Sequence, residues 1–210
     1  MCGICGFIAK NNKVSSTLPV LDMCAAIRHR GPDDEGFLLL QDNNFNNYSG
    51  DDTIPSIKNQ YTNIRNAPAY CTAALGFRRL SILDISEKGH QPMSNARNSI
   101  SITFNGEIYN YQILRKQLTE LGYHFNTQSD TEVVQCLQYF NGMFAIAILD
   151  KNSKKLFLVR DRVGIKPLYY SNESDVLIWG SEIKSILKHP SVSKNINWKG
   201  IGLNFALQST

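Results

Sequence analysis

The chain has 210 residues, of which 42% are hydrophobic and 19% are charged. That size and composition fit one globular domain with a substantial core. The net charge of +4 arises from 22 basic and 18 acidic residues spread along the chain. No run of Lys and Arg follows the pattern of a phosphate-binding surface, so we expect no nucleic-acid partner.

The apolar stretches also argue against a membrane protein. The stretch 142–149 is far shorter than the about 20 residues that a membrane-spanning helix needs. The first residues lack a basic segment followed by an apolar one. Five cysteines form an odd set without the spacing of a disulfide framework. We therefore expect no membrane association and a cytoplasmic protein with free thiols.

Hydrophobic spacing predicts the elements of the first 121 residues in chain order. A strand over 2–9 precedes a helix over 18–27 and a strand over 37–41. The polar, Asn-rich stretch 42–66 predicts a long surface loop without chemistry. The elements predicted after it are strands over 70–77, 80–83 and 99–104, a sharp turn at Asn105 and Gly106, and a helix over 109–121.

The last third of the chain is predicted to be mostly strand. Ser129 and Glu132 have the spacing of a capping box, which predicts a helix with Asp130 in its first turn, where its charge suits the helix dipole. A strand meander over 143–149, 155–160, 167–170 and 176–179 follows, and a short helix over 182–187 closes it. Strands gather at both ends with helices between them, which indicates the α+β class.

Five segments carry a family resemblance: MCGICGF, RHRGPDDEG, RRLSILD, FNGEIYNY, and GMFAIAILD followed by RDRVGIKPLYY. Together they resemble the N-terminal class II glutamine amidotransferase (glutaminase) domain of glutamine-dependent asparagine synthetases. Single motifs also resemble the glutaminase domains of glucosamine-phosphate synthase and of the phosphoribosyl-pyrophosphate amidotransferase. RLSILD, NGEIYNY and GIKPLYY favour the asparagine synthetase branch.

The resemblance implies an N-terminal-nucleophile hydrolase fold, a four-layer αββα sandwich of antiparallel sheets. We expect it over residues 1–190, with 191–210 as a linker or the start of a synthetase domain. The stretch 130–142 is shorter than is usual in the family, which puts the competence of the pocket in question.

Cys2 is the candidate nucleophile. Removal of Met1, which the small side chain of Cys2 permits, would give this residue both a thiol and a free α-amine. An amine with a pKa of about 7.7 to 8.0 can act as general base for a thiol with a pKa of about 8.5. The alternative is a small buried side chain. Cys2 and Cys5 also form a C-x-x-C pair, but no further ligands accompany it, and we expect no metal.

The resemblance also implies a glutamine pocket. Asn105 and Gly106 would stabilise the oxyanion, although an isolated Asn-Gly pair is usually only a turn. Arg79 would bind the carboxylate of glutamine and Asp130 its ammonium group, although each alone would be assigned as surface charge or helix cap. The remaining pocket residues are expected to be Leu80, Ser81, Ile82, Leu83 and Glu107.

Other charged residues of the motifs are assigned to structure. Four of them should hold the nucleophile strand and the closing meander, with Arg30 approaching Cys2: His29, Arg30, Asp161 and Arg162. The remaining histidines, His90, His124 and His189, are scattered, and no triad can be built from them.

The implied reaction is hydrolysis of L-glutamine to glutamate and ammonia through a thioester on Cys2. The ammonia would serve ATP-dependent conversion of aspartate to asparagine in a synthetase domain, in the same full-length chain or in a separate subunit. We expect no cofactor in this chain, and ATP and Mg in the synthetase domain. A different acceptor, in surface-sugar or secondary-metabolite synthesis, and a non-catalytic scaffold are the alternatives, and a homodimer stays open.

Overall fold

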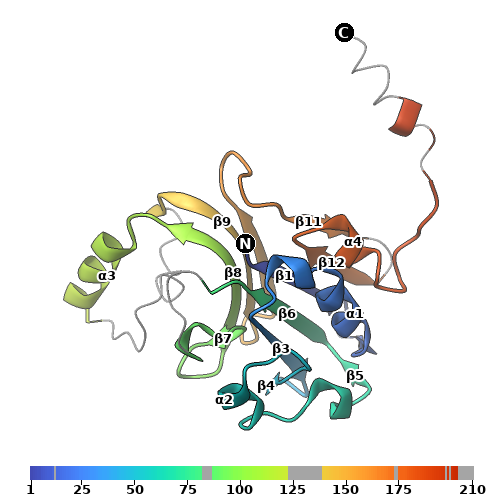
Figure 1. Ribbon diagram of the computed structural model, residues 1–210, viewed down its shortest axis with the longest axis horizontal. Helices are drawn as coiled ribbons and strands as arrows, with labels where there is room; N and C mark the ends of the chain where they lie inside the picture. Colours follow the sequence, from blue (N-terminus) through green and yellow to red (C-terminus); the bar gives the residue numbers. More distant parts are fainter. Residues whose placement is uncertain are drawn as a thin grey trace.

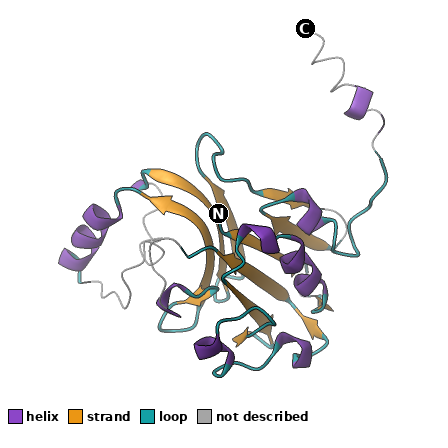
Figure 2. Cartoon of the chain, viewed as in Figure 1, coloured by secondary structure: helices purple, strands orange, loops and turns teal. Residues whose placement is uncertain are grey.

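Two antiparallel β-sheets lie face to face, with helices on their outer sides (Figure 1). The structure is a computed structural model that describes residues 1–11, 13–81, 87–122, 139–172, 175–196, 198 and 200–202. Figure 2 shows the two sheets together with the helices that flank them. This arrangement confirms the predicted α+β sandwich.

The larger sheet contains the start of the chain in its interior. Its six strands run in the order β11 (Tyr169–Ser171), β12 (Val176–Gly180), β1 (Gly3–Ala9), β6 (Ala73–Arg79), β3 (Asp34–Gln41) and β4 (Asn44–Tyr48). The smaller sheet has four strands in the order β10 (Lys155–Arg160), β9 (Gly142–Asp150), β8 (Ile100–Ile108) and β7 (Met93–Ser94). A short separate pair joins β2 (Ser15–Ser16) to β5 (Tyr70–Cys71).

The helices are short and belong to the outer layers or to connections. They are α1 (Pro19–Ala26), α2 (Pro55–Lys58), α3 (Tyr111–Glu120) and α4 (Ile183–Ile186), with 3-10 turns η1 (Arg28–Arg30), η2 (Ile64–Asn66) and η3 (Glu87–Gly89). None of the helices in the described ranges is both long and apolar enough to cross a membrane.

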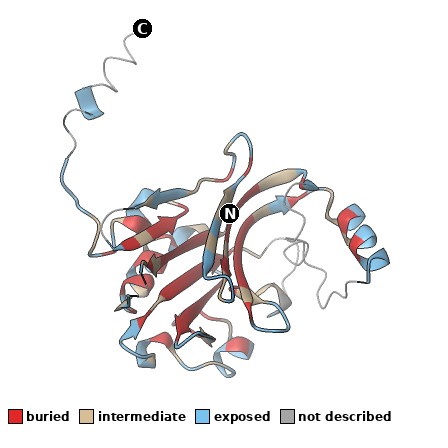
Figure 3. Cartoon of the chain, turned by 180° about the vertical axis from the view of Figure 1, so that it is seen from behind, coloured by how far each residue is buried: buried red, intermediate tan, exposed pale blue. Residues whose placement is uncertain are grey.

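Alternation along β1 separates the two faces of the larger sheet. Cys5 and Phe7 point outward and pack against Val20 and Met23 of α1. Ile4 points inward, where it packs against Ala145 of the facing sheet. Because successive side chains of a strand point to opposite faces, residues 2, 4, 6 and 8 belong to the inner face. Figure 3 shows the central strands of both sheets as largely buried.

The smaller sheet has the same two-sided character. Its outer face carries Phe104 and Ile146, which pack with Leu114 and Leu118 of α3. Its inner face carries Ala147 and other residues of β9, which pack against the larger sheet. α3 therefore completes the fourth layer, opposite α1 and α4.

Two predicted loops are wrong. The stretch 42–66 contains strand β4, helix α2 and turn η2, and it buries Phe45, Tyr48, Ile57 and Ile64. The Asn side chains of this edge strand obscured its alternation. Asn105 and Gly106 form no turn, because β8 continues to Ile108 and pairs them with Ala145 and Phe144 of β9.

Two further corrections concern strands. Leu80 and Ser81 follow β6 without belonging to a strand, and Ile82 and Leu83 lie outside the described residues. The final strands form no single meander, because β9 and β10 belong to the smaller sheet and β11 and β12 to the larger one. The chain crosses from one sheet to the other over residues 161–168.

The helix predicted around Asp130 also lies outside the described residues.

Gly6 offers a test of the central packing. A Cβ on this glycine would lie against the ring of the buried Trp179 and 2.5 Å from the Ala74 carbonyl oxygen, which belongs to a paired strand and cannot retreat. We expect Gly6→Ala to lower the free energy of unfolding by about 1 to 3 kcal/mol, the usual cost of overpacking. Urea unfolding measures this change. Gly202→Ala is the control, since none of the described residues has an atom within 4 Å of that Cβ, and equal midpoints for the two variants would contradict the packing described.

Candidate active site

Strand alternation brings three predicted site residues to the space between the sheets. Cys2 lies two residues before Ile4 on the inner face of β1, and it packs against the cluster of Ile4, Phe77 and Ala145. Arg79 follows Phe77 by two residues and therefore shares its face of β6. Asn105 of β8 lies directly opposite Ala145 of β9. Three strands from two sheets thus meet at this end of the sandwich.

The Cys2 thiol lies against the main chain at the end of β6. The Leu80 N–H points to Sγ at 3.4 Å, and Sγ is 3.7 Å from the Leu80 carbonyl oxygen. The thiol is half-buried, so it is held in position but still accessible. Leu80, which was predicted to line the pocket, is therefore in contact with the candidate nucleophile.

The ionisation of Cys2 reflects opposing influences. Burial raises the pKa of this thiol above its ordinary value. The Leu80 N–H and the positive charges of the chain terminus, Arg79 and Lys166 lower the pKa in part. The thiol is consequently protonated near neutral pH, and a reaction at this sulfur needs a base.

Arg30 fixes the main chain beside the thiol. Its Nε donates to the Cys2 carbonyl oxygen at 3.0 Å, and its Nη1 pairs with Glu182 at 3.2 Å. His29 contacts the same Glu182 carboxylate at 2.9 Å. Arg30 and His29 thus connect the start of β1 to the beginning of α4. These contacts agree with the structural roles assigned to His29 and Arg30, and with the approach of Arg30 to Cys2.

The Asn105 side chain has an unusual environment. It is 1% exposed, and its Nδ2 has no hydrogen-bond partner within the part of the chain that the structure describes. A buried donor without a partner costs about 1 to 3 kcal/mol, and a water molecule, an ion or a ligand can remove that cost. Gly106 lets β8 approach β9 closely, because a Cβ there would overlap the Met143 carbonyl oxygen.

Lys166 is a site residue that the sequence analysis missed. It is 7% exposed, and its charge acts on the Cys2 thiol. Asp161 orders this crossing segment by accepting the N–H groups of Lys166 at 2.9 Å and Phe144 at 3.2 Å. Burial alone would raise the pKa of Asp161, but the main-chain donors around it lower that pKa below its ordinary value. The signal was present in the motif RDRVGIKPLYY, which spans both residues.

Three consecutive acidic residues hold the surroundings of Arg79. Asp33 accepts the Ser81 N–H at 2.7 Å. Asp34 pairs with His90 at 2.7 Å. Glu35 forms a buried ion pair with Arg78 at 2.9 Å. The acidic residues of the motif RHRGPDDEG therefore hold the chain on both sides of Arg79. The sequence analysis had not assigned this role to them.

The remaining predicted residues do not all come together. Glu107 is exposed on β8, beyond Asn105. Ile82, Leu83 and Asp130 lie outside the described residues. Cys5 points away from Cys2 and contacts the Gly76 carbonyl oxygen at 3.7 Å, on the face that carries α1. The C-x-x-C pair therefore cannot share an ion, and no cluster of three metal-ligating side chains occurs among the described residues.

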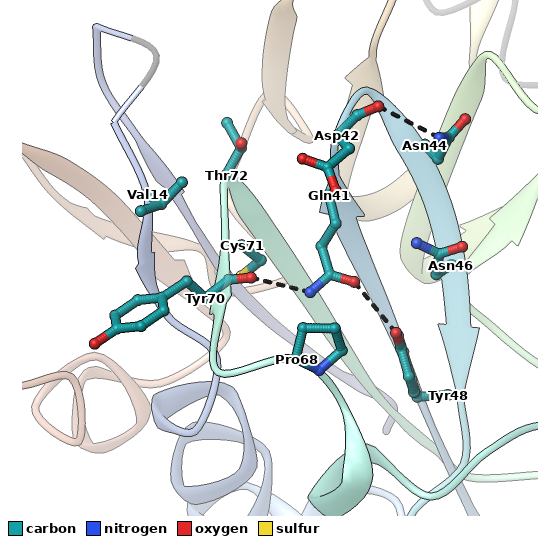
Figure 4. A pocket seen from close by; sticks show the side chains of 10 residues that line it. All are labelled: Val14, Gln41, Asp42, Asn44, Asn46, Tyr48, Pro68, Tyr70, Cys71 and Thr72. Atoms are coloured by element: carbon teal, nitrogen blue, oxygen red, sulfur yellow. Dashed lines mark hydrogen bonds between the residues drawn. The ribbon is translucent and has the colours of Figure 1, made fainter.

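A separate pocket lies at the other end of the larger sheet (Figure 4). Gln41 and Tyr48 in its wall are hydrogen-bonded to each other at 3.2 Å. Gln41 follows Asp34 by seven steps along β3, which at about 3.3 Å per step separates this pocket from the Arg79 end by about 23 Å. The pocket is therefore distinct from the site around Cys2.

Comparison with known proteins gives the same family as the motifs. Residues 64–210 match the family described as the glutamine amidotransferase domain. The chain is 37% identical to a putative glutamine-hydrolysing asparagine synthetase 2 of Methanocaldococcus jannaschii, covering 99% of this chain and 39% of the relative. It is 39% identical to the glutamine-hydrolysing asparagine synthetase 2 of Bacillus subtilis, covering 95% of this chain and 24% of the relative.

A solved structure supports the fold. The glutamine phosphoribosylpyrophosphate amidotransferase of Bacillus subtilis superposes with a TM-score of 0.71 at 20% identity, over 88% of this chain and 43% of that one. The chain spans about a quarter to two fifths of the length of the two synthetase relatives. The matched family model confirms the family of the resemblance, and the similar proteins are named glutamine-hydrolysing asparagine synthetases: the chain belongs to the glutamine amidotransferase domain family.

Proposed function

We propose that this chain hydrolyses the side-chain amide of L-glutamine, with Cys2 as the nucleophile. The observation that carries the proposal is the buried Asn105 Nδ2, which has no hydrogen-bond partner among the described residues and lies between the sheets, where the half-buried Cys2 thiol also lies. A thiol attack on an amide creates an oxyanion, and a fixed, desolvated donor is the group that stabilises it best. Family membership supports the same reaction.

The reaction needs a base, which Cys2 itself can supply. Once Met1 is removed, the α-amine of Cys2 accepts the thiol proton. The sulfur attacks the amide carbon, and Asn105 with the main chain of Gly106 stabilises the oxyanion. The C–N bond breaks as the ammonium returns the proton to nitrogen, which leaves as ammonia. Water activated by the same amine then cleaves the γ-glutamyl thioester and releases glutamate.

The amino-acid end of glutamine requires charged partners. Arg79 is proposed to bind the carboxylate, because its planar fork matches that group. Asp130 is proposed to bind the ammonium group. Main-chain groups of residues 80–83 and of Glu107 are proposed to line the rest of the pocket.

The names of the relatives support a proposal for the fate of the ammonia. They are named glutamine-hydrolysing asparagine synthetases, and this chain spans only part of their length. We infer that the ammonia converts activated aspartate to asparagine in a synthetase domain that holds ATP and Mg. Residues 1–190 would form the glutaminase, which needs no cofactor of its own, and 191–210 would lead toward the synthetase. We place the reaction in the cytoplasm and leave homodimer formation to measurement.

A scaffold without catalysis is the rival from another class. The intact Cys2 and its Leu80 contact speak against it, since a scaffold has no need of a positioned thiol. A glutaminase that serves a different acceptor would keep the same site. The acceptor product made with the complete protein distinguishes that alternative.

Asn105→Ala tests the oxyanion role. We expect the turnover number for glutamine hydrolysis to fall by the equivalent of about 2.7 to 4 kcal/mol, with a much smaller change in KM, because the lost donor acts in the transition state. Steady-state kinetics measure both. Thr103→Val is the matched control, since the Thr103 hydroxyl is another buried group on the same face of β8 that has no hydrogen-bond partner in the described part of the chain. An unchanged turnover number in Asn105→Ala would reduce Asn105 to a structural residue.

Arg79→Lys and Asp130→Asn test recognition of the amino-acid end. Each substitution removes a fork or a charge that glutamine uses through its carboxylate or ammonium group. We expect a higher KM for glutamine in both variants, measured from initial rates of glutamate formation. Unaltered affinity in both would move the pocket elsewhere.

The state of the chain terminus tests the base. In a protein that retains Met1, the nitrogen of Cys2 is an amide and cannot accept a proton. We expect that preparation to be inactive, although its thiol is intact, and Cys2→Ala to be inactive for lack of a nucleophile. Glutaminase rates are compared for preparations with and without Met1, with intact mass after treatment with a glutamine-like electrophile. Equal rates would eliminate the terminal amine as the base.

A further inference from the structure

The segment Gly89, His90 and Gln91 contacts three strands of the candidate site, although none of its residues belongs to the proposed reaction. It begins at the last residue of turn η3, and the His90 N–H donates to the Glu87 carbonyl oxygen at 2.9 Å. We propose that Gly89 and His90 are positioning residues that set the Arg79 guanidinium for the carboxylate of the substrate. This inference rests on the proposed glutaminase function.

Gly89 lies directly against the Arg79 guanidinium. A Cβ on Gly89 would overlap Nη2 of Arg79, and would lie 2.6 Å from Cζ and 3.1 Å from Nε. The planar guanidinium therefore packs directly against the main chain of this glycine, which has no side chain to separate the two. Arg79 is 5% exposed, so its guanidinium has little room to move aside and keep the same direction. Any side chain at position 89 must displace the fork.

His90 anchors this glycine to the larger sheet. Its Nδ1 lies 2.7 Å from the Asp34 carboxylate, which is itself almost fully buried and also accepts the Ile54 N–H at 3.0 Å. A carboxylate only accepts, so Nδ1 is the donor. The imidazole packs over Gly36, where a Cβ would come within 2.7 Å of Cε1 and Nε2 of His90. In the register of β3 and β6, Asp34 lies directly opposite Arg79.

Gln91 connects the same segment to the facing sheet. Its buried Oε1 accepts the Phe104 N–H at 2.6 Å, one residue before Asn105. One short segment thus relates Arg79 on the larger sheet to Asn105 on the smaller one. The distance between the carboxylate end and the reacting amide of a substrate would depend on this connection.

The geometry separates positioning from stability. The atoms that a Gly89 Cβ meets are the far end of a flexible side chain, so Gly89→Ala should displace the guanidinium without unfolding the protein. The test uses the Cys2→Ala protein, which binds without hydrolysis, and titration calorimetry with two ligands. Glutamine carries the carboxylate, and glutamine α-carboxamide has the same side chain without that charge.

We expect Gly89→Ala to weaken glutamine binding by about tenfold or more, the usual effect of losing a charge-assisted hydrogen bond. Binding of the α-carboxamide and the unfolding midpoint should stay unchanged. Gly202→Ala is the matched control and should alter neither ligand. His90→Asn, which keeps an N–H donor at the δ position, should retain more of the glutamine affinity than His90→Leu.

Four outcomes decide the inference. Selective loss of glutamine binding in Gly89→Ala supports it. Equal affinity for glutamine in Gly89→Ala and its parent overturns the inference. If Arg79→Lys weakens glutamine binding in the same assay, the proposed function is kept and only the role of Gly89 and His90 is lost. Equal loss for both ligands also overturns it, because the role would then be general packing. No glutamine binding by the parent protein overturns the proposed function and this inference together.

Discussion

The face-to-face packing of two antiparallel sheets is the constraint on which the site depends. Each inner face must be apolar to bury the other, and Ile4, Phe77 and Ala145 meet that requirement in the middle. At the end of the sandwich the same alternation presents Cys2, Arg79 and Asn105 instead. The site is therefore the polar margin of the core. Burial fixes the strands, and the strands in turn determine where the side chains of the site point.

The acids at and just before the start of β3 hold this margin in place through the groups that they bind. Asp33, Asp34 and Glu35 each hold a different neighbour of Arg79. Buried ion pairs add little net stability, because desolvation offsets their attraction, but they fix geometry when every partner is present. Asp161 does the same for the segment that carries Lys166. The charged groups here orient the chain and side chains of the site and add little to the free energy of unfolding.

Sequence reasoning reached the α+β class and most of the strands, because alternation is a local property, and the motifs reached the family, whose resemblance implied the layers. It failed where burial decides the conformation. Asn105 and Gly106 have the composition of a turn, yet pairing with β9 keeps them in a strand. The Asn-rich stretch before Tyr48 concealed an edge strand. Lys166 and His90 could not be linked to the site from spacing, since their contacts join segments far apart in the chain.

The position of β1 in the interior of its sheet has a consequence for how the molecule is made. This strand precedes both of its partners in the chain, since it pairs with Gly76 of β6 on one side and with Gly180 of β12 on the other. Such distant pairings form slowly and leave an edge exposed until the second partner arrives. The Arg30–Glu182 contact that steadies Cys2 also waits for the last part of the fold. The Cys2 thiol therefore gains its full surroundings only after both β12 and Glu182 have been synthesised.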